Sequence, residues 1–191
     1  MSKTARRLHY TYAEYLALED ESPIRHEYLE GEVYAMAGGS PDHAALAASV
    51  IGILRGQLPP GCRAFTSALR VRVPSTGLST YPDASVVCGR TQRASDDPLA
   101  VVNPVLLIEV TSSSTEEYDR GEKLRHYQNL ASVREVLIVS HRGPQLTLHR
   151  REPQGWAELL VTSGQTIELA SVGARVAVDD VYREELEDAG R

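Results

Sequence analysis

The sequence of 191 residues has few cysteines and no long apolar run. Cys62 and Cys88 are its two cysteines, and they are not spaced as a CxxC pair. This argues against a zinc site and predicts two reduced, structural thiols in a cytoplasmic protein. No apolar stretch approaches the ~20 residues that a membrane-spanning helix needs. No apolar segment follows the basic stretch 1–7, so a secretory signal is not expected.

Several catalytic signatures are also missing, namely a phosphate-binding glycine loop, a nucleophile elbow and an HExxH motif. Repeats and domain boundaries are not evident, so we predict one domain over 1–191, with 1–8 a flexible N-terminus. The net charge of −6 counts against a broad surface for non-specific nucleic-acid binding, which is usually basic. A divalent cation held by clustered carboxylates would reverse that sign locally.

One acidic residue interrupts the most apolar segment of the chain. Residues 105–110 are apolar on both alternating faces except for Glu109, and this pattern is typical of a central strand covered on both sides. An unpaired carboxylate in such a strand would cost several kcal/mol. We therefore expect Glu109 to be protonated, ion-paired or bound to a metal.

A helix is predicted directly after this strand. Ser114 and Glu117 have the spacing of a capping box. Asp119, Lys123 and Tyr127 then recur at every fourth residue, so they share one helix face. Such a row is often a solvated face with one ion pair, but here it would follow Glu109 closely enough to join it.

A second acid is expected at the start of a neighbouring strand. Residues 81–88 read as a strand with Asp83, Ser85 and Val87 on one face. Carboxylates on neighbouring strands can bind Mg²⁺ or Mn²⁺ through oxygen ligands. Such an ion activates water and stabilises charge on a phosphoryl group, and Lys123 beside it could orient the water or neutralise that charge.

The N-terminal half supplies two secondary candidates. Glu27 lies in a predicted hairpin over 26–37, where it is either an edge charge that discourages sheet pairing or an acid facing the metal. His43 lies on the buried side of the first turn of a helix predicted from Ser40 to Gln57. It is either a packing residue or part of the site.

The remaining segments predict a mixed sheet. Residues 62–73 read as one strand with Arg70 and Arg72 on the alternate face, which is either a solvent face or a phosphate-facing strip. A hairpin is expected around 141–144, and a short helix after Asp179 and Asp180. Helices alternating with groups of strands indicate an α/β (α+β) domain with a mixed β-sheet flanked by helices.

Several blocks together resemble one family. They are the Tyr-Thr-Tyr-Ala-Glu-Tyr start, His-Glu-Tyr-Leu-Glu-Gly-Glu-Val-Tyr-Ala-Met, Ser-Pro-Asp-His, Tyr-Pro-Asp, Ile-Glu-Val-Thr-Ser-Ser-Ser-Thr and Asp-Arg-Gly-Glu-Lys-Leu-Arg-His-Tyr. In this order they resemble the Uma-type family of restriction endonucleases, in the PD-(D/E)XK nuclease superfamily. The resemblance implies a restriction-endonuclease-like fold with extra β-hairpins. It also implies Asp83 and Glu109 as metal ligands, Lys123 as the lysine, and Glu27 as an additional acid. The superfamily's usual lysine position, two residues after the acid, holds Thr111.

These observations together predict a Mg²⁺- or Mn²⁺-dependent endonuclease acting on nucleic acid, with DNA as the expected substrate. Two alternatives remain open: a binding module on the same fold that does not cut, and a hydrolase of small phosphoesters, which an acidic protein would handle more readily than long DNA. A homodimer is expected, because two sites related by a two-fold axis can cut both strands of a duplex.

Overall fold

The computed structural model describes residues 9–36 and 38–183, so the expectation for residues 1–8 falls outside the described part. The helices are α1 (Tyr12–Glu21), α2 (Pro41–Arg55), α3 (Glu116–Tyr118), the π-helix η1 (Asp119–Lys123), α4 (Leu124–Gln128) and α5 (Val178–Val181). The strands are β1 (His26–Leu29), β2 (Glu32–Ala35), β3 (Cys62–Thr66), β4 (Arg70–Val73), β5 (Leu78–Thr80), β6 (Ala84–Cys88), β7 (Ala100–Val101), β8 (Leu106–Val110), β9 (Glu135–Val139), β10 (Gln145–Glu152), β11 (Gly155–Thr162), β12 (Thr166–Leu169) and β13 (Ala174–Ala177).

The strands form three sheets. A six-stranded sheet has the order β11-β10-β9-β8-β6-β3, a five-stranded sheet has the order β2-β1-β5-β4-β7, and β12 pairs with β13. The large sheet is mixed, because β8 and β9 are parallel while the other pairs are antiparallel. The predicted α+β class with a mixed sheet, flanking helices and extra hairpins is confirmed.

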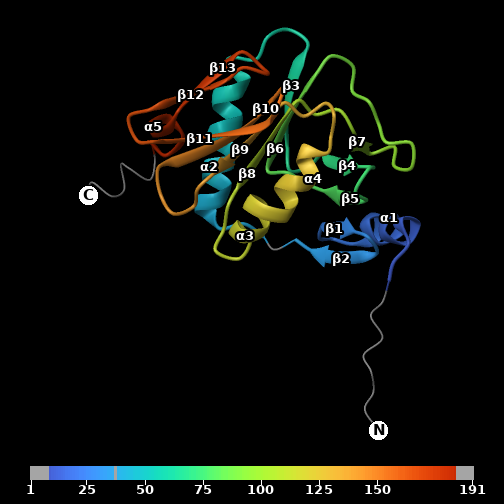
Figure 1. The fold of residues 1–191 in the computed structure, drawn as a ribbon. Coiled ribbons are helices and arrows are strands. Elements are labelled where there is room, and N and C mark those ends of the chain that lie inside the picture. The colour runs from blue at the N-terminus through green and yellow to red at the C-terminus, as the bar shows by residue number, and fades with distance from the viewer. Residues whose placement is uncertain (1–8, 37, 184–191) are drawn as a thin grey trace.

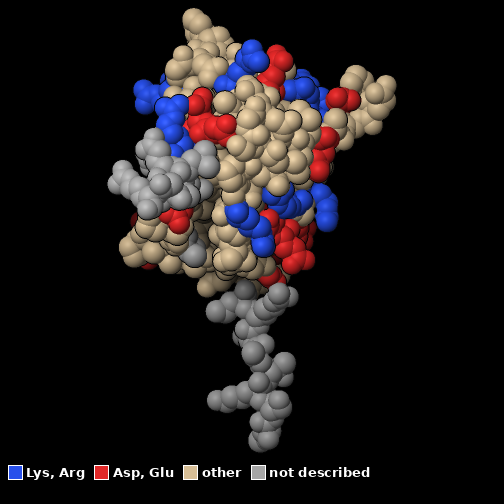
Figure 2. Space-filling view, turned by 90° about the vertical axis from the view of Figure 1, so that its left-hand side faces the viewer, with Lys and Arg blue, Asp and Glu red and all other residues tan. Residues whose placement is uncertain are grey.

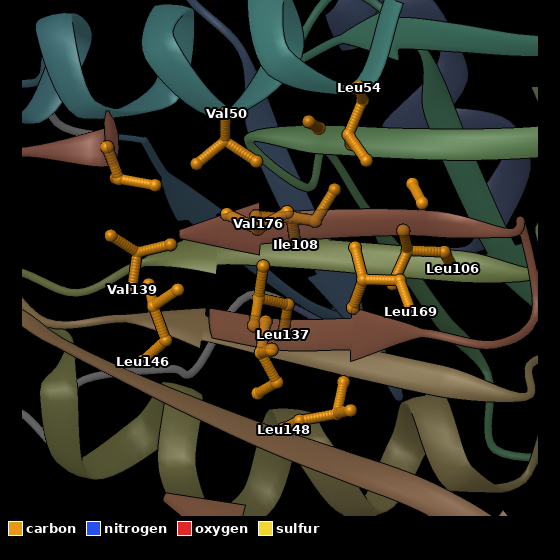
Figure 3. Packing of buried hydrophobic residues seen from close by; sticks show 14 of the residues in the cluster. Val50, Leu54, Leu106, Ile108, Leu137, Val139, Leu146, Leu148, Leu169 and Val176 are labelled. Carbon is orange, nitrogen blue, oxygen red and sulfur yellow. The ribbon is translucent and has the colours of Figure 1, made fainter. Parts of the chain in front are cut away.

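Each face of the six-stranded sheet is covered by a different layer. On one face α2 packs with α5, β12 and β13, as Figure 1 shows on its left. Figure 3 shows Val50 and Leu54 of α2 pointing toward the strands, among them Leu106 and Ile108 of β8. Apolar burial on this face is the main stabilising contribution.

The opposite face meets α4 and the five-stranded sheet. Leu107, Val136 and Ile138 of the large sheet pack against Leu124 and Tyr127. β8 is therefore covered on both sides, as its apolar run predicts, and every one of its residues is buried. Glu109 shares the second face with Leu107, because side chains two residues apart in a strand point the same way.

Several local predictions are confirmed. Thr11 caps α1 and forms a capping box with Glu14. Ser40 caps α2, which has proline in its first turn. The β1–β2 hairpin turns through Glu30 and Gly31, both with positive φ (47° and 92°), a conformation that glycine adopts without a steric penalty.

The strand predicted over 62–73 is wrong in its extent. The chain turns after Thr66, so β3 and β4 belong to different sheets. Arg70 and Arg72 line neither a solvent face nor a phosphate-facing strip. Both are buried: Arg70 Nη1 lies 2.6 Å from Asp97 Oδ2, and Arg72 Nη2 lies 3.2 Å from Asp96 Oδ2.

Three further expectations are corrected. Ser114 does not cap the helix after β8, because Thr115 occupies the N-cap and makes no side-chain capping bond. The last helix begins at Val178, before the two aspartates expected to precede it. Cys62 and Cys88 face each other across β3 and β6 and form a disulfide, not two reduced thiols. The prediction of a cytoplasmic protein is based partly on two reduced thiols, and that part of its basis is wrong.

Within the described ranges, no helix combines the length and the apolar character that crossing a membrane requires.

Candidate active site

Glu109 is the centre of a buried polar cluster. It is 3 % exposed, and β8 holds it facing α4. The Tyr127 hydroxyl donates a hydrogen bond to Glu109 Oε1, and Lys123 Nζ lies 3.0 Å from the same oxygen. The expectation that this acid needs a partner is therefore met by two groups from the helix that follows.

Asp83 lies next to Glu109 on the neighbouring strand. Ala84 of β6 pairs with Ile108 of β8, and continuing this antiparallel register by one residue places Asp83 opposite Glu109. Asp83 Oδ2 accepts a 2.8 Å hydrogen bond from the Val110 amide. The carboxylate is thus fixed by the backbone of the strand that carries Glu109.

His43 approaches Asp83 from the other side. Its Nε2, in the first turn of α2, lies 3.3 Å from Asp83 Oδ2. The hydrogen bond to Asp83 raises the pKa of His43. Of the two alternatives that the sequence leaves open for this histidine, the structure places it against the acid cluster.

Lys123 lies among three carboxylates. Its Nζ is 2.9 Å from Glu27 Oε1, 3.0 Å from Glu109 Oε1 and 3.7 Å from Asp119 Oδ1. Burial by itself lowers the pKa of Lys123, but attraction to Glu109, Glu27 and Asp119 outweighs burial and raises the pKa well above its usual value. Lys123 is therefore a buried ammonium ion.

The pKa values of two acids of the cluster are also raised, and for an acid this disfavours the charged form. Burial raises the pKa of Glu109 to about 8, with Lys123 opposing this rise and the nearby charges of Asp83 and Asp119 adding to it. Burial also raises the pKa of Asp119. A carboxylate that is costly to ionise in this site gains from an added cation.

Glu27 comes from the five-stranded sheet and closes the cluster. It is 8 % exposed, and its Oε1 accepts a hydrogen bond from the hydroxyl of Thr80 on β5. Because β1 pairs with β5 at Tyr28 and Ser79, this register brings Glu27 and Thr80 together. The edge-charge interpretation of Glu27 is therefore wrong for this residue.

The helical segment that carries Lys123 is irregular. Residues Asp119–Lys123 form a π-helix between α3 and α4, and single π-helical turns often occur at functional sites. The sequence predicts the shared face of Asp119, Lys123 and Tyr127 but not this irregularity.

Two residues that contact the candidate site are not predicted from the sequence, namely Thr80, which bonds Glu27, and Tyr118. The Tyr118 ring lies 6.0 Å from Lys123 Nζ, and burial raises its pKa. One available signal would have strengthened the choice of Lys123. It is the only lysine in the described part of the chain, where arginine and histidine are the other basic residues.

The donor set is suited to a hard divalent cation. Asp83 and Glu109 offer carboxylate oxygens, which Mg²⁺ and Mn²⁺ prefer. Among residues 9–36 and 38–183, no group of three or more His, Cys, Asp or Glu side chains is arranged to hold a metal ion.

Comparisons with known proteins agree with this architecture. A family model named Uma2 and described as "Putative restriction endonuclease" matches residues 12–179. The uncharacterized protein slr1290 of Synechocystis sp. is 35 % identical over 172 residues, which cover 89 % of this chain and 90 % of that protein. A second uncharacterized protein of the same organism, sll1609, is 30 % identical over 132 residues, covering 68 % and 73 %.

A crystal structure shares the fold. It is described as a putative nuclease belonging to DUF820 from Anabaena variabilis, and it superposes with a TM-score of 0.75 at 19 % identity. The match covers 91 % of this chain and 98 % of that one.

Proposed function

The chain belongs to the Uma2 family, and from this premise we propose that it is a metal-dependent endonuclease that hydrolyses phosphodiester bonds of DNA. The observation that carries the proposal is one buried ammonium, Lys123, among three carboxylates, next to the paired strand positions of Asp83 and Glu109. Burying this many charges together costs free energy, and titratable groups perturbed in this way cluster at functional sites.

Asp83 and Glu109 would hold the Mg²⁺ or Mn²⁺ ion. When bound, such an ion supplies a Lewis acid for the phosphoryl group and lowers the pKa of a bound water. The Val110 amide and His43 fix the Asp83 carboxylate, and Tyr127 fixes Oε1 of Glu109. Both described partners of Glu109 contact Oε1, which leaves Oε2 for a cation.

Lys123 acts as a cation in this proposal. A raised pKa keeps it protonated, so it donates hydrogen bonds to the scissile phosphate or to the attacking water and does not remove a proton. Preorganised charge of this kind stabilises negative charge that develops in the transition state. Glu27 and Asp119 orient the ammonium and hold it in place.

The test is cleavage of plasmid DNA with Mg²⁺, with Mn²⁺ and with EDTA. We expect wild-type protein to cut only with a metal ion, and Asp83→Asn or Glu109→Gln to lose at least about 100-fold in rate. Glu152→Gln, an exposed acid at the end of β10, is the matched control and should retain activity. Equal cleavage by wild type and Asp83→Asn would refute the proposal.

One observation favours a second candidate. The net charge of −6 suits a small phosphoester better than long DNA. Faster turnover of a dinucleotide than of plasmid DNA would assign the site to small substrates. Metal-independent DNA binding without any turnover would assign the protein to the non-cutting class.

We also propose that the endonuclease is a homodimer, since two active sites related by a two-fold axis can cut both strands of a duplex. Analytical ultracentrifugation of the full chain tests this, and a monomer at all concentrations would contradict it.

A further inference from the structure

A groove of about 1030 Å³ lies between β3 and the connection from β6 to β7. Three arginines line it, Arg63, Arg90 and Arg93. Its apolar lining includes Phe65, Leu69 and Leu99, the last of which is 65 % exposed. A basic groove with an aromatic ring is the arrangement that proteins use to follow a nucleic-acid strand.

The groove opens on the same sheet face as the candidate active site. Phe65 of β3 pairs with Ser85 of β6, and Ser85 pairs with Leu107 of β8. Paired residues point to the same face, and so do residues two apart along a strand. Phe65 therefore shares the face of Asp83 and Glu109.

The distances along the strand are short. Phe65 pairs with Ser85, which is two residues beyond Asp83, and Arg63 pairs with Val87, which is four residues beyond. At roughly 3.3 Å per residue, the ring lies about 7 Å along the sheet from Asp83 and Arg63 about 13 Å. These spacings correspond to one and two nucleotides of an extended strand.

The groove arginines have no acidic partners, in contrast to six arginines elsewhere in this protein. Arg70, Arg72, Arg120, Arg142, Arg150 and Arg183 all form ion pairs with carboxylates. Within the described ranges, Arg63, Arg90 and Arg93 form none, and all three are exposed. Six arginines outside the groove also form no ion pair within the described ranges, namely Arg25, Arg55, Arg125, Arg134, Arg151 and Arg175. The groove differs from these because three unpaired arginines line one surface, and such a concentration of positive charge favours an anion.

The side of the molecule with α5 and β12 lacks this separation of charge. The side of the molecule drawn in Figure 2, where α5 and β12 lie, carries basic and acidic side chains next to one another. The groove differs because its charged lining is entirely arginine.

A fourth arginine lies at the level of Asp83. Arg25 Nη1 donates a 2.5 Å hydrogen bond to the carbonyl of Ser67, and its guanidinium lies 4.8 Å from the centre of the Tyr81 ring. Ser67 follows the β3 residue that pairs with Ala84. Positive charge therefore extends along β3 from the candidate site to the groove.

We propose that this groove binds a single-stranded segment of the nucleic acid substrate, with its phosphates on Arg63, Arg90 and Arg93 and a base stacked on Phe65. This rests on the proposed function for the identity of the substrate. The apolar lining favours unstacked bases over a closed duplex, whose bases are not exposed to it. Stacking uses the sequence-independent π-face of each base, so the groove binds without sequence preference.

The experiment measures binding of fluorescein-labelled oligo(dT) by anisotropy in EDTA, where cleavage is not supported. The full chain is compared with Arg63→Gln/Arg90→Gln/Arg93→Gln and with Phe65→Leu. The control is Arg55→Gln/Arg134→Gln/Arg175→Gln, which removes equal charge from exposed positions outside the groove lining. Circular dichroism confirms that each variant is folded.

We expect the groove variant to bind oligo(dT) more than about tenfold more weakly than wild type. The slope of the logarithm of the binding constant against the logarithm of the salt concentration should become shallower by about two, since each phosphate contact to a single strand contributes about 0.7. Phe65→Leu should weaken binding at least about fivefold without changing the slope. The control should bind like wild type. Oligo(U) in place of oligo(dT) reports whether DNA or RNA is preferred.

Equal affinities of the groove variant and its control for oligo(dT) would overturn the proposal. It would also be overturned if a blunt duplex bound more tightly than oligo(dT) and its affinity were unchanged by Phe65→Leu. The outcome is separable from catalysis. If Asp83→Asn and wild type bind oligo(dT) equally while neither cuts, the proposed function fails and the groove assignment stands.

Discussion

Lys123 Nζ and Glu109 Oε1 lie 3.0 Å apart beneath the surface, joining β8 to the helical segment that follows it. The same ammonium reaches Glu27 on a strand of the other sheet. One side chain therefore connects the two sheets at the candidate active site, and its removal should affect stability and activity together.

The first prediction concerns Lys123→Met. Loss of the ammonium leaves Glu27, Glu109 and Asp119 without their shared cation, and breaking such a buried group costs about 3–5 kcal/mol of unfolding free energy. Urea denaturation followed by circular dichroism measures this cost. Arg134→Met, an exposed basic residue, is the control and should change stability little.

Mg²⁺ should raise the thermal midpoint of Lys123→Met more than that of wild type, because a divalent cation can replace part of the missing charge. An Mg²⁺ response that is no larger in the variant would contradict a cation site at Glu109.

The second prediction concerns the hydroxyl of Tyr127. Tyr127→Phe removes the donor to Glu109 Oε1 and should lower kcat without raising KM, because the carboxylate is less well fixed. Its unfolding free energy should fall by about 1–3 kcal/mol. Tyr182→Phe is the matched control, since this buried hydroxyl donates its hydrogen bond to the carbonyl of Ser140 and not to Glu109. Equal kinetics for the two variants would refute the positioning role of Tyr127.

The third prediction is an acid-induced loss of stability through Asp97. Burial by itself raises the pKa of this carboxyl group, but hydrogen bonds from Arg70 and the Leu99 amide outweigh it and hold the pKa below the usual 3.8. The unfolded chain therefore binds the proton first as pH falls. The stabilisation is complete above pH 3.8 and is lost as pH falls through the folded-state pKa.

Asp97→Asn should remove this contribution. Its deficit in unfolding free energy should be constant at neutral pH and shrink in acid, as measured by urea denaturation across pH. Asp20→Asn, an exposed acid on α1, should show no such deficit. A deficit for Asp97→Asn that grows in acid would show that the sign is wrong.

The fourth prediction concerns the disulfide between Cys62 and Cys88, which closes a loop with a sequence separation of 26. Reduction should lower the unfolding free energy by about 3 kcal/mol. The double variant Cys62→Ala/Cys88→Ala should have the same lowered stability as the reduced wild-type protein, and reductant should not change it further. Two titratable thiols in the denatured, unreduced wild type would contradict the bond.

Sequence and structure agree for several features that depend on nearby residues, although the capping box predicted at Ser114 is wrong. The capping box at Thr11, the β1–β2 turn and the apolar run of β8 follow from local sterics and from side-chain periodicity. The shared face of Asp119, Lys123 and Tyr127 also follows from spacing, because one helical turn takes nearly four residues. Even the need of Glu109 for a partner is readable, since burial of an unpaired carboxylate is too costly.

Tertiary structure alone decided which distant groups meet. The sequence determined that Glu109 would be buried, but only the β6–β8 register placed Asp83 beside it, and only packing of the five-stranded sheet against the helical segment placed Glu27 on Lys123. Strand register also joined Cys62 to Cys88, and the turn after Thr66 sent Arg70 to Asp97 instead of solvent. Periodicity fixes the direction of a side chain within its own strand or helix. The partner depends on how separate segments align, and no single segment carries that information.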